Sequence, residues 1–262
     1  MYKREYQFLV VFTVLLFSGC VGSSSADYDT TTSTPEIKPA EALPIAESLY
    51  AQRKNLDKVR EAVKLLEKAR NPEKRDFDVE WKFAQYSYFL GSREGVDDDE
   101  AEKVLKRGLT GANIAKRIQP DKPDGHFWYA AILGAQSKRS PVTVGVVSVK
   151  KIKKAMNRVI EIDPSYQGAS AYDGLGQLEM GTRGLAGGSA EKAVEYLEKA
   201  LELNKNNSYI RLHLGEAYLA VNKDAEAKTQ LQFVLKMKPD PEFLPEYEES
   251  VEKAKKLLEQ KF

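Results

Sequence analysis

The chain has 262 residues, of which 42% are hydrophobic and 30% charged, enough for one or two domains with a buried core. Forty basic and 39 acidic residues give a formal net charge of +1, which argues against nucleic acid as a main partner, because that class of protein presents a strongly basic face. One cysteine and two histidines exclude an internal disulfide framework and leave little material for a zinc site or a histidine-dependent triad. We therefore expect no metal, no other cofactor and no catalytic centre.

The N-terminus has the pattern of a secretory signal peptide. Lys3 and Arg4 precede a mostly apolar stretch from Phe8 to Phe17, and small residues follow it. A membrane-spanning helix needs roughly 20 apolar residues, and this stretch has about half that number, so a transmembrane anchor is disfavoured. We predict that residues 1–19 direct export and are then removed.

Cys20 follows Ser18 and Gly19 and is the single cysteine of the chain. The arrangement resembles the lipobox of bacterial lipoproteins, with Phe17 where that motif usually has leucine. The resemblance implies that Cys20 carries a lipid anchor on the periplasmic side of the cell envelope, held stably by several acyl chains. Val21, rather than aspartate, comes next, which by analogy with enteric sorting signals favours the outer membrane. Plain cleavage and a retained hydrophobic N-terminus are the alternatives.

The segment 20–38 consists mainly of serine, threonine, aspartate and proline. It has too few apolar side chains to offset the entropy lost on ordering, so we predict a flexible tether. From residue 39 onward apolar residues recur every three or four positions with no sustained period of two, which is typical of helices. We therefore predict one helical domain over residues 39–262.

The stretch from Ser208 to Pro241 matches the tetratricopeptide repeat. With Ser208 as position 1, the matching residues are Leu214, Gly215, Tyr218, Ala227, Leu231, Val234 and Pro239. Small residues at two of these positions let a pair of antiparallel helices approach each other, larger residues fill the space between them, and the proline ends the second helix.

The same pattern recurs towards the N-terminus. Gly176 and Ala193 hold the small positions of the preceding unit, and Gly134 holds one in the unit before it. Two looser helix pairs are expected between Glu41 and Leu105, and an amphipathic run from Glu246 to Leu258 is expected to cap the last pair. The prediction is an all-α fold: a right-handed superhelix of antiparallel helix pairs, eleven helices in total, with a C-terminal capping helix.

Two clusters suggest ligand sites but lack the remainder of the corresponding motifs. Gly184, Gly187 and Gly188 suggest a phosphate-binding loop, but the lysine that this motif requires at a fixed spacing is missing. The acidic run from Asp97 to Glu100 suggests a cation site, but no Asp-x-Asp-x-Asp-Gly loop follows. We predict instead that Ser189 caps the helix after it and that the acidic run begins another helix.

The candidate partner-binding residues are those that the repeat frame places on the concave face of the superhelix. They are Trp128, Asp173, Gln177, Tyr209 and Glu216. Aromatic side chains there would anchor a bound segment, and polar side chains would orient it. For Trp128 a place in the core is an equal alternative. The valine-rich stretch 141–149 would fill the core, fold against the concave face or contact a second subunit.

Residues 122–203 combine several further features. They are an aromatic-Ala-x-x-Leu-Gly helix within Trp128 to Gly134, a long helix ending in Asp163-Pro164, a helix with Leu175-Gly176, and the insertion Gly187-Gly188 before Glu191-Lys192-Ala193. The combination resembles the T-component family of tripartite ATP-independent periplasmic (TRAP) transporters. The resemblance implies a periplasmic, lipid-anchored, trimeric protein with cryptic tetratricopeptide motifs. It also implies docking of the transporter's solute-binding subunit and a hydrophobic pore for ligand.

We therefore predict a non-catalytic, periplasmic, lipid-anchored protein that binds a partner protein or extended peptide on its concave face. The solute-binding subunit of a TRAP-type transporter is the first candidate partner. One alternative is an envelope-assembly scaffold that acts on outer-membrane or pilus subunits. Another is a binder of a small apolar ligand, with the aromatic segment and the valine-rich stretch as its pocket.

Overall fold

A computed structural model of the protein describes residues 37–141 and 145–262, without the side chain of Glu242. The expected signal peptide (residues 1–19), Cys20 and nearly all of the expected tether (residues 20–38) lie outside the described residues, so these assignments remain predictions. Among the described helices, none has both the length and the apolar character that a membrane crossing requires.

All regular secondary structure in the described part of the chain is helical, as predicted. Eleven α-helices and one short 3-10 helix occur in the order α1 Pro39–Ala51, α2 Leu56–Ala69, α3 Phe77–Ser92, α4 Asp98–Ile118, α5 Pro123–Arg139, α6 Val146–Ile162, α7 Tyr166–Gly181, α8 Ala190–Leu203, α9 Ser208–Ala220, α10 Asp224–Lys236, η2 Pro241–Phe243 and α11 Leu244–Lys261. The number of α-helices over these residues equals the predicted eleven.

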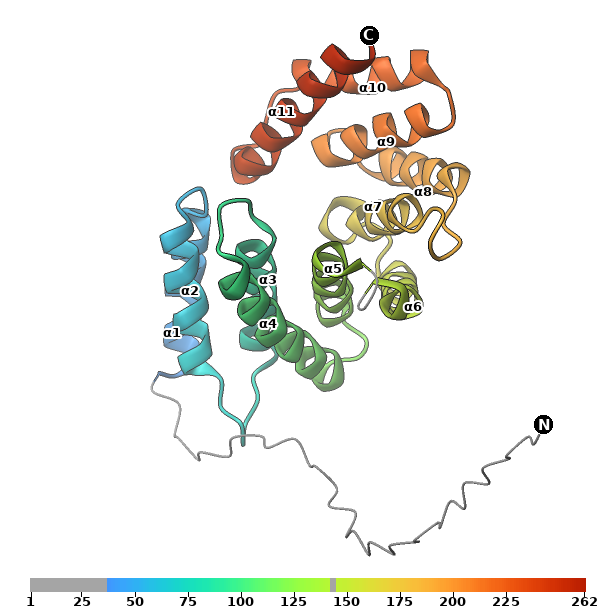
Figure 1. Ribbon diagram of the computed structural model, residues 1–262. Coiled ribbons are helices and arrows are strands. Elements are labelled where there is room, and N and C mark those ends of the chain that lie inside the picture. The colour runs from blue at the N-terminus through green and yellow to red at the C-terminus, as the bar shows by residue number, and fades with distance from the viewer. Residues whose placement is uncertain (1–36, 142–144) are drawn as a thin grey trace, which may run out of the picture. The chain divides into compact units, whose positions relative to one another are not determined.

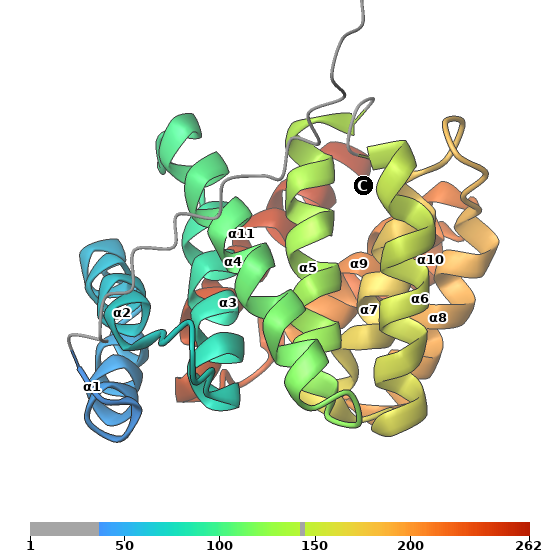
Figure 2. The same cartoon turned by 90° about the horizontal axis from the view of Figure 1, so that it is seen from below.

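The helices pair in chain order, from α1 with α2 to α9 with α10, and successive pairs stack into a curved array (Figure 1). The first helix of each pair also contacts the first helix of the next, in the order α1, α3, α5, α7 and α9, and α11 packs on α9 and α10. The odd-numbered helices from α3 onward therefore share one side of the array, named the inner face, while α4, α6, α8 and α10 lie on its outer side (Figures 1 and 2). This arrangement confirms the predicted superhelix of helix pairs with a capping helix.

Two of the predicted glycines lie where paired helices approach most closely. A Cβ atom at Gly176 would lie 2.6 Å from Leu197 Cγ, and one at Gly215 would lie 2.9 Å from Leu231 Cδ2. Both distances are well inside ordinary carbon–carbon contact, so α7 packs on α8, and α9 on α10, at a spacing that a larger residue would disturb. The predicted small residues of the second helices are fully buried as well: Ala193 and Ala227.

The prediction for Gly134 is wrong. A Cβ atom at this position would meet no atom within 4 Å, so α5 does not approach a neighbour there. The close approach of α5 is made instead by Gly125 at its N-terminal end, where a Cβ atom would lie 2.4 Å from the backbone nitrogen of Lys116 in α4. Leu133 and Gly134 match the repeat motif in sequence, but Gly134 lies where no neighbouring helix comes close.

The packing of α3 on α4 uses small residues that the repeat spacing did not reveal. A Cβ atom at Gly91 would lie 2.5 Å from Leu105 Cγ, and one at Gly108 would lie 2.5 Å from Ser87 Cβ. Gly111, one turn further along α4, is similarly close to the backbone of α3. Isolated glycines inside a helical pattern are unfavourable for the helix itself, which indicates a packing reason for keeping them.

Both predicted helix starts are capped as expected. The Asp97 side chain accepts hydrogen bonds from the backbone N–H groups of Asp99 and Glu100 at the start of α4. The Ser189 hydroxyl accepts one from the backbone N–H of Lys192 at the start of α8. The acidic run and the serine after the glycine-rich loop therefore supply N-terminal caps.

Candidate functional site on the inner face

The inner face carries a buried histidine–aspartate pair. His213 in α9 and Asp173 in α7 share a 2.7 Å hydrogen bond between Nδ1 and Oδ1. Their side chains are only 17% and 12% exposed. Because α7 and α9 are the first helices of adjacent pairs, this contact joins two repeat units.

The surroundings of the pair favour the protonated imidazole. Burial lowers the pKa of His213, but the carboxylates of Asp173 and Glu216 outweigh burial, so the pKa is raised above its usual value. Within the described residues, no serine, threonine or cysteine side chain hydrogen-bonds to the His213 ring. The hydrogen bond of the pair fixes α7 against α9.

Polar contacts lead from this pair to the surface. The Gln177 side-chain amide donates a 2.8 Å hydrogen bond to Asp173 Oδ2, and Lys138 Nζ in α5 lies 3.4 Å from Gln177 Oε1. Lys138 is exposed and Gln177 is half-buried. Three successive first helices thus contribute to one connected polar cluster on the inner face.

Tyr209 links the cluster to the C-terminal helix. Its ring lies parallel to the His213 ring, with centroids 5.7 Å apart and 3° between the planes. Its hydroxyl donates a 2.6 Å hydrogen bond to Glu249 Oε2 in α11, and burial raises the pKa of Tyr209, which keeps this donor protonated. Arg93, which follows α3, contacts the same carboxylate oxygen at 2.5 Å. The helix α11 is therefore tied both to α9 and to the end of α3.

A second set of ion pairs joins the first turn of α11 to the connection between α1 and α2. Arg53 donates from Nε and Nη2 to the two carboxylate oxygens of Glu246 at 3.1 and 3.0 Å. Lys54 and Glu248 form a neighbouring pair at 2.9 Å, with both side chains more exposed. The capping helix thus contacts the first pair as well as the last, which agrees with its course in Figure 1.

All five candidate residues lie on first helices that form the inner face: Trp128 on α5, Asp173 and Gln177 on α7, and Tyr209 and Glu216 on α9. Tyr209 and Glu216 are seven residues apart in α9 and flank His213, so all three share one side of that helix. The structure brings Asp173, Gln177 and Tyr209 together through His213. Contact of these residues with a partner stays a prediction.

Trp128 lies in the core, which is one of the two places that the sequence allows for it. Its side chain is 7% exposed. The ring centroid is 4.9 Å from that of Phe127 and 5.6 Å from that of Tyr88. The aromatic residues of α3 and α5 thus pack on one another, and Trp128 offers no open surface to a partner.

The valine-rich stretch 141–149 divides between core and surface. Val149 is 9% exposed, whereas Val146 and Val147 at the start of α6 are 49% and 64% exposed. Residues 142–144 lie outside the described part of the chain. Since α6 is on the outer side of the array, the two exposed valines belong neither to the inner face nor to the core.

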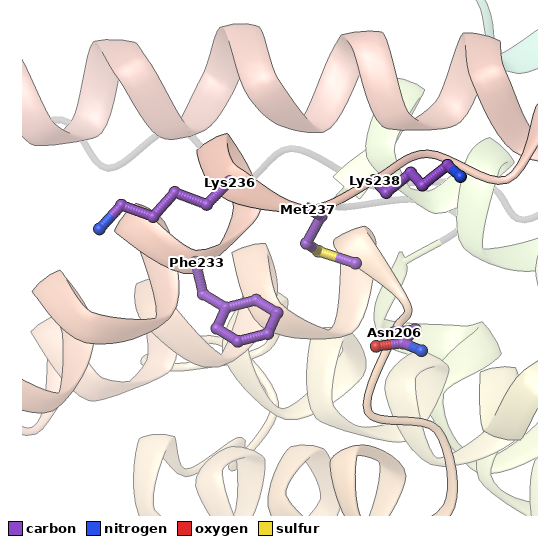
Figure 3. Close-up of a pocket in the computed structure, with 5 residues that line it drawn as sticks. All are labelled: Asn206, Phe233, Lys236, Met237 and Lys238. Carbon is purple, nitrogen blue, oxygen red and sulfur yellow. The ribbon is translucent and has the colours of Figure 1, made fainter.

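A shallow hollow of about 330 Å³ lies between the α8–α9 connection and the end of α10 (Figure 3). It is lined by Asn206, Phe233, Lys236, Met237 and Lys238. Phe233 is 43% exposed, and the Arg211 guanidinium carbon lies 3.5 Å from the centroid of its ring. The two lysines point away from each other, so they converge on no common ligand (Figure 3).

Several residues of the inner face, or in contact with α11, were not among the predicted site residues: Arg53, Arg93, His213, Glu246 and Glu249. His213 follows Tyr209 by four residues, and this helical spacing alone could have indicated a stacked pair. No comparable signal exists for the arginines and glutamates, because each partner lies more than 150 residues away along the chain.

Two protein-family profiles match parts of this chain. The sequence profile described as Regulator of microtubule dynamics protein 1-3 matches residues 43–177, half of the chain, from within α1 to within α7. The chain belongs to this family. A tetratricopeptide-repeat profile matches residues 185–244, from the loop before α8 to the first residue of α11. The second half of this family member is therefore of tetratricopeptide type, as the repeat spacing predicts.

Solved structures with the same type of fold include a thermophilic tetratricopeptide-repeat protein from Thermus thermophilus. It aligns with a TM-score of 0.58 at 19% sequence identity, over 81% of this chain and 98% of that one. A MamA protein aligns with a TM-score of 0.46 at 12% identity, over 85% of this chain and 97% of that one. No curated protein matches the sequence.

Proposed function

We propose that this protein is a non-catalytic docking subunit of the bacterial cell envelope, which is anchored through Cys20 and holds a partner protein on its inner face. Stacked helix pairs generate extended concave surfaces, and such surfaces serve protein recognition in repeat proteins generally. The tetratricopeptide character of the chain supports the partner-binding part of the proposal.

The polar row on the inner face is the observation that carries the proposal. Lys138 from α5, Gln177 from α7 and Glu216 from α9 come from three successive repeats and retain contact with solvent. The buried pair of Asp173 and His213 holds this row in place. Donors and acceptors fixed on rigid helices at regular intervals suit an extended polypeptide, whose backbone groups also recur at regular intervals.

The proposed membrane anchor depends on the predicted signal peptide and on Cys20. Residues 1–19 would export the chain, Cys20 would carry the lipid, and residues 20–38 would leave the helical domain free to move on the periplasmic side, with the outer membrane favoured. The Cys20→Ala variant should then leave the membrane fraction. Unchanged membrane retention would falsify the anchor while leaving the inner-face proposal intact.

The first candidate partner is the solute-binding subunit of a TRAP-type transporter. Support comes from the features of residues 122–203 and from their places in the structure. Asp163 and Pro164 follow α6 directly, and Gly187 and Gly188 lie in the loop between α7 and α8. The buried Glu179 carboxylate accepts a hydrogen bond from the backbone N–H of Ser189, which fixes the end of that loop. The insertion is thus an ordered part of the fold.

The name of the matching family refers to microtubule dynamics. For this chain we propose only the helical scaffold and the binding of a partner protein. Microtubules are cytoplasmic polymers, whereas the predicted signal peptide and Cys20 indicate export to the envelope. The family profile matches the helices from α1 to α7, which contain the inner-face residues Lys138, Asp173 and Gln177. The shared property is therefore proposed to be the scaffold.

Photo-crosslinking in native cells tests the inner-face proposal. A photoreactive amino acid is placed at Glu216 and, as a matched control, at Lys199, which is exposed on α8 of the outer side. We expect a discrete protein adduct at Glu216 and none at Lys199, with the partner identified by mass spectrometry. A solute-binding subunit would support the transporter assignment, and an outer-membrane or pilus subunit would replace it with the assembly scaffold. Absence of an adduct at Glu216, or equal adducts at both positions, would contradict docking on the inner face.

A further inference from the structure

The outer face of α6 has an unusual composition. Between Val146 and Arg158 this helix has five cationic residues and no acidic residue, and the first acidic residue is Glu161. Lys150, Lys151 and Lys154 are exposed, and none of them forms an ion pair within the described residues. The helix therefore presents positive charge that the fold does not neutralise.

Helical geometry places the charge and the exposed apolar residues on one stripe. Val147, Lys151, Lys154 and Arg158 are spaced by four, three and four residues, which aligns them along one side of α6. Val147 is 64% exposed, and Val146 beside it is 49% exposed. The opposite side of the helix packs into the core through Ile152, Met156 and other residues, so the stripe faces solvent.

The neighbouring end of α4 extends the same positive surface. Lys116 lies near Lys154 and Arg117: burial lowers the pKa of Lys116, and these two cations lower it further. Ile118, next to Arg117, is 38% exposed. Acidic groups in this region are few. Asp121 and Glu161 both pair with Arg158, and Glu179 pairs with Lys153, which leaves Lys150, Lys151 and Lys154 without a neutralising carboxylate among the described residues.

We propose that the outer face of α6, with the end of α4, docks on an anionic membrane surface. Lysines flanked by exposed aliphatic residues at one end of a helix suit a lipid interface, where the cations meet anionic head groups and the aliphatic side chains enter the boundary of the acyl region. Figure 2 shows α6 running beside α5 along the outer side of the array, and no described helix covers its outer face.

The inference rests on the proposed lipid anchor, because a tether of about twenty residues keeps the domain close to one membrane. Docking through α6 would then orient the domain, with the inner face directed away from the lipid and free to receive a partner.

An acidic protein is the competing occupant of the same stripe. The valines at one end of the stripe favour lipid, since a purely electrostatic protein contact would not require them.

Vesicle sedimentation tests the inference without the anchor. The chain from residue 21 onward retains every described helix, and it is mixed with phosphatidylcholine vesicles that either contain or lack phosphatidylglycerol. We expect binding to the anionic vesicles only, weakening as ionic strength rises. The triple variant Lys150→Gln, Lys151→Gln, Lys154→Gln should bind about 100-fold more weakly, given roughly tenfold for each 1.4 kcal/mol and about 1 kcal/mol per lysine.

A second triple variant controls for total charge. Lys255→Gln, Lys256→Gln and Lys261→Gln remove the same charge from exposed positions on α11 and should leave binding nearly unchanged. Equal losses in the two triple variants, or no binding of the unmodified chain to anionic vesicles, overturns the proposal. Protein adducts from a crosslinker at Lys151, combined with absent vesicle binding, would assign the stripe to an acidic protein and would also overturn the membrane proposal.

None of these outcomes bears on Cys20 or on the adduct at Glu216, so failure of the membrane proposal is distinguishable from failure of the proposed function.

Discussion

The Arg53 guanidinium donates two hydrogen bonds to the Glu246 carboxylate although the residues are 193 positions apart in the sequence. Arg53 is 7% exposed, and its guanidinium carbon lies 5.3 Å from the centroid of the Tyr50 ring. Short repeats normally contact only their neighbours, so a bridge between the first pair and the last helix departs from the usual behaviour of a solenoid. It couples the stability of α1 and α2 to that of α11.

We expect Glu246→Gln to lower the free energy of unfolding by about 2–3 kcal/mol, because it removes the negative charge that the buried Arg53 contacts. The control is Glu248→Gln, which breaks the exposed pair with Lys54 and should cost less than about 1 kcal/mol. Urea unfolding followed by circular dichroism measures both. Equal losses in the two variants would show that the bridge contributes no more than a surface pair.

Replacement of Trp128 tests its place in the core. We expect Trp128→Ala to lower the free energy of unfolding by about 3–5 kcal/mol, because the ring packs against Phe127 and Tyr88 and the substitution leaves a cavity. Trp81→Ala is the control: Trp81 is only half-buried and donates to Asp78 at the surface, so its loss should be smaller. Thermal melting of the two variants gives the comparison. An unchanged melting temperature for Trp128→Ala, with weakened partner capture, would instead return Trp128 to the binding surface.

The pH dependence of stability tests the histidine–aspartate pair. The folded pKa of His213 is raised, so the stability it contributes is complete below the unfolded pKa and is lost as the pH rises through the folded value. We therefore expect the unfolding free energy of the natural chain to fall, relative to His213→Gln, as the pH rises above about 6.5, the ordinary pKa of histidine. Denaturant unfolding at several pH values measures this slope. Parallel pH profiles for the two proteins would mean that His213 is not held protonated by Asp173.

Much of the fold follows from short-range spacing in the sequence. The contacts of Gly176 with Leu197 and of Gly215 with Leu231 were predictable because each involves two helices joined by one short connection. The caps at Asp97 and Ser189 were predictable for the same reason, since a cap depends on residues two or three positions away.

The site was only partly predictable, because its contacts are non-local. The repeat frame places Asp173, Gln177 and Tyr209 on the inner face, but the frame carries no information on where α11 lies. Arg93 follows α3 and Glu249 lies in α11, 156 positions further along the chain, so the spacing within repeats does not connect them. A periodic pattern specifies which side of a helix is buried. The contacts of α11 with Arg53 and Arg93 depend instead on the curvature of the array, which is summed over several helix pairs.

Gly134 and Gly176 form a matched pair for the packing argument, since both follow a leucine in the first helix of a repeat unit. We expect Gly176→Ala to destabilise the fold by about 1–3 kcal/mol, because the new Cβ would lie 2.6 Å from Leu197 Cγ and α7 or α8 would have to shift. We expect Gly134→Ala to stabilise it by about 0.5–1 kcal/mol, because the Cβ meets no atom within 4 Å and alanine favours the helix. Chemical denaturation of both variants measures the difference in sign. Destabilisation of similar size at both positions would mean that Gly134 also packs against a neighbouring helix, as the repeat motif alone predicts.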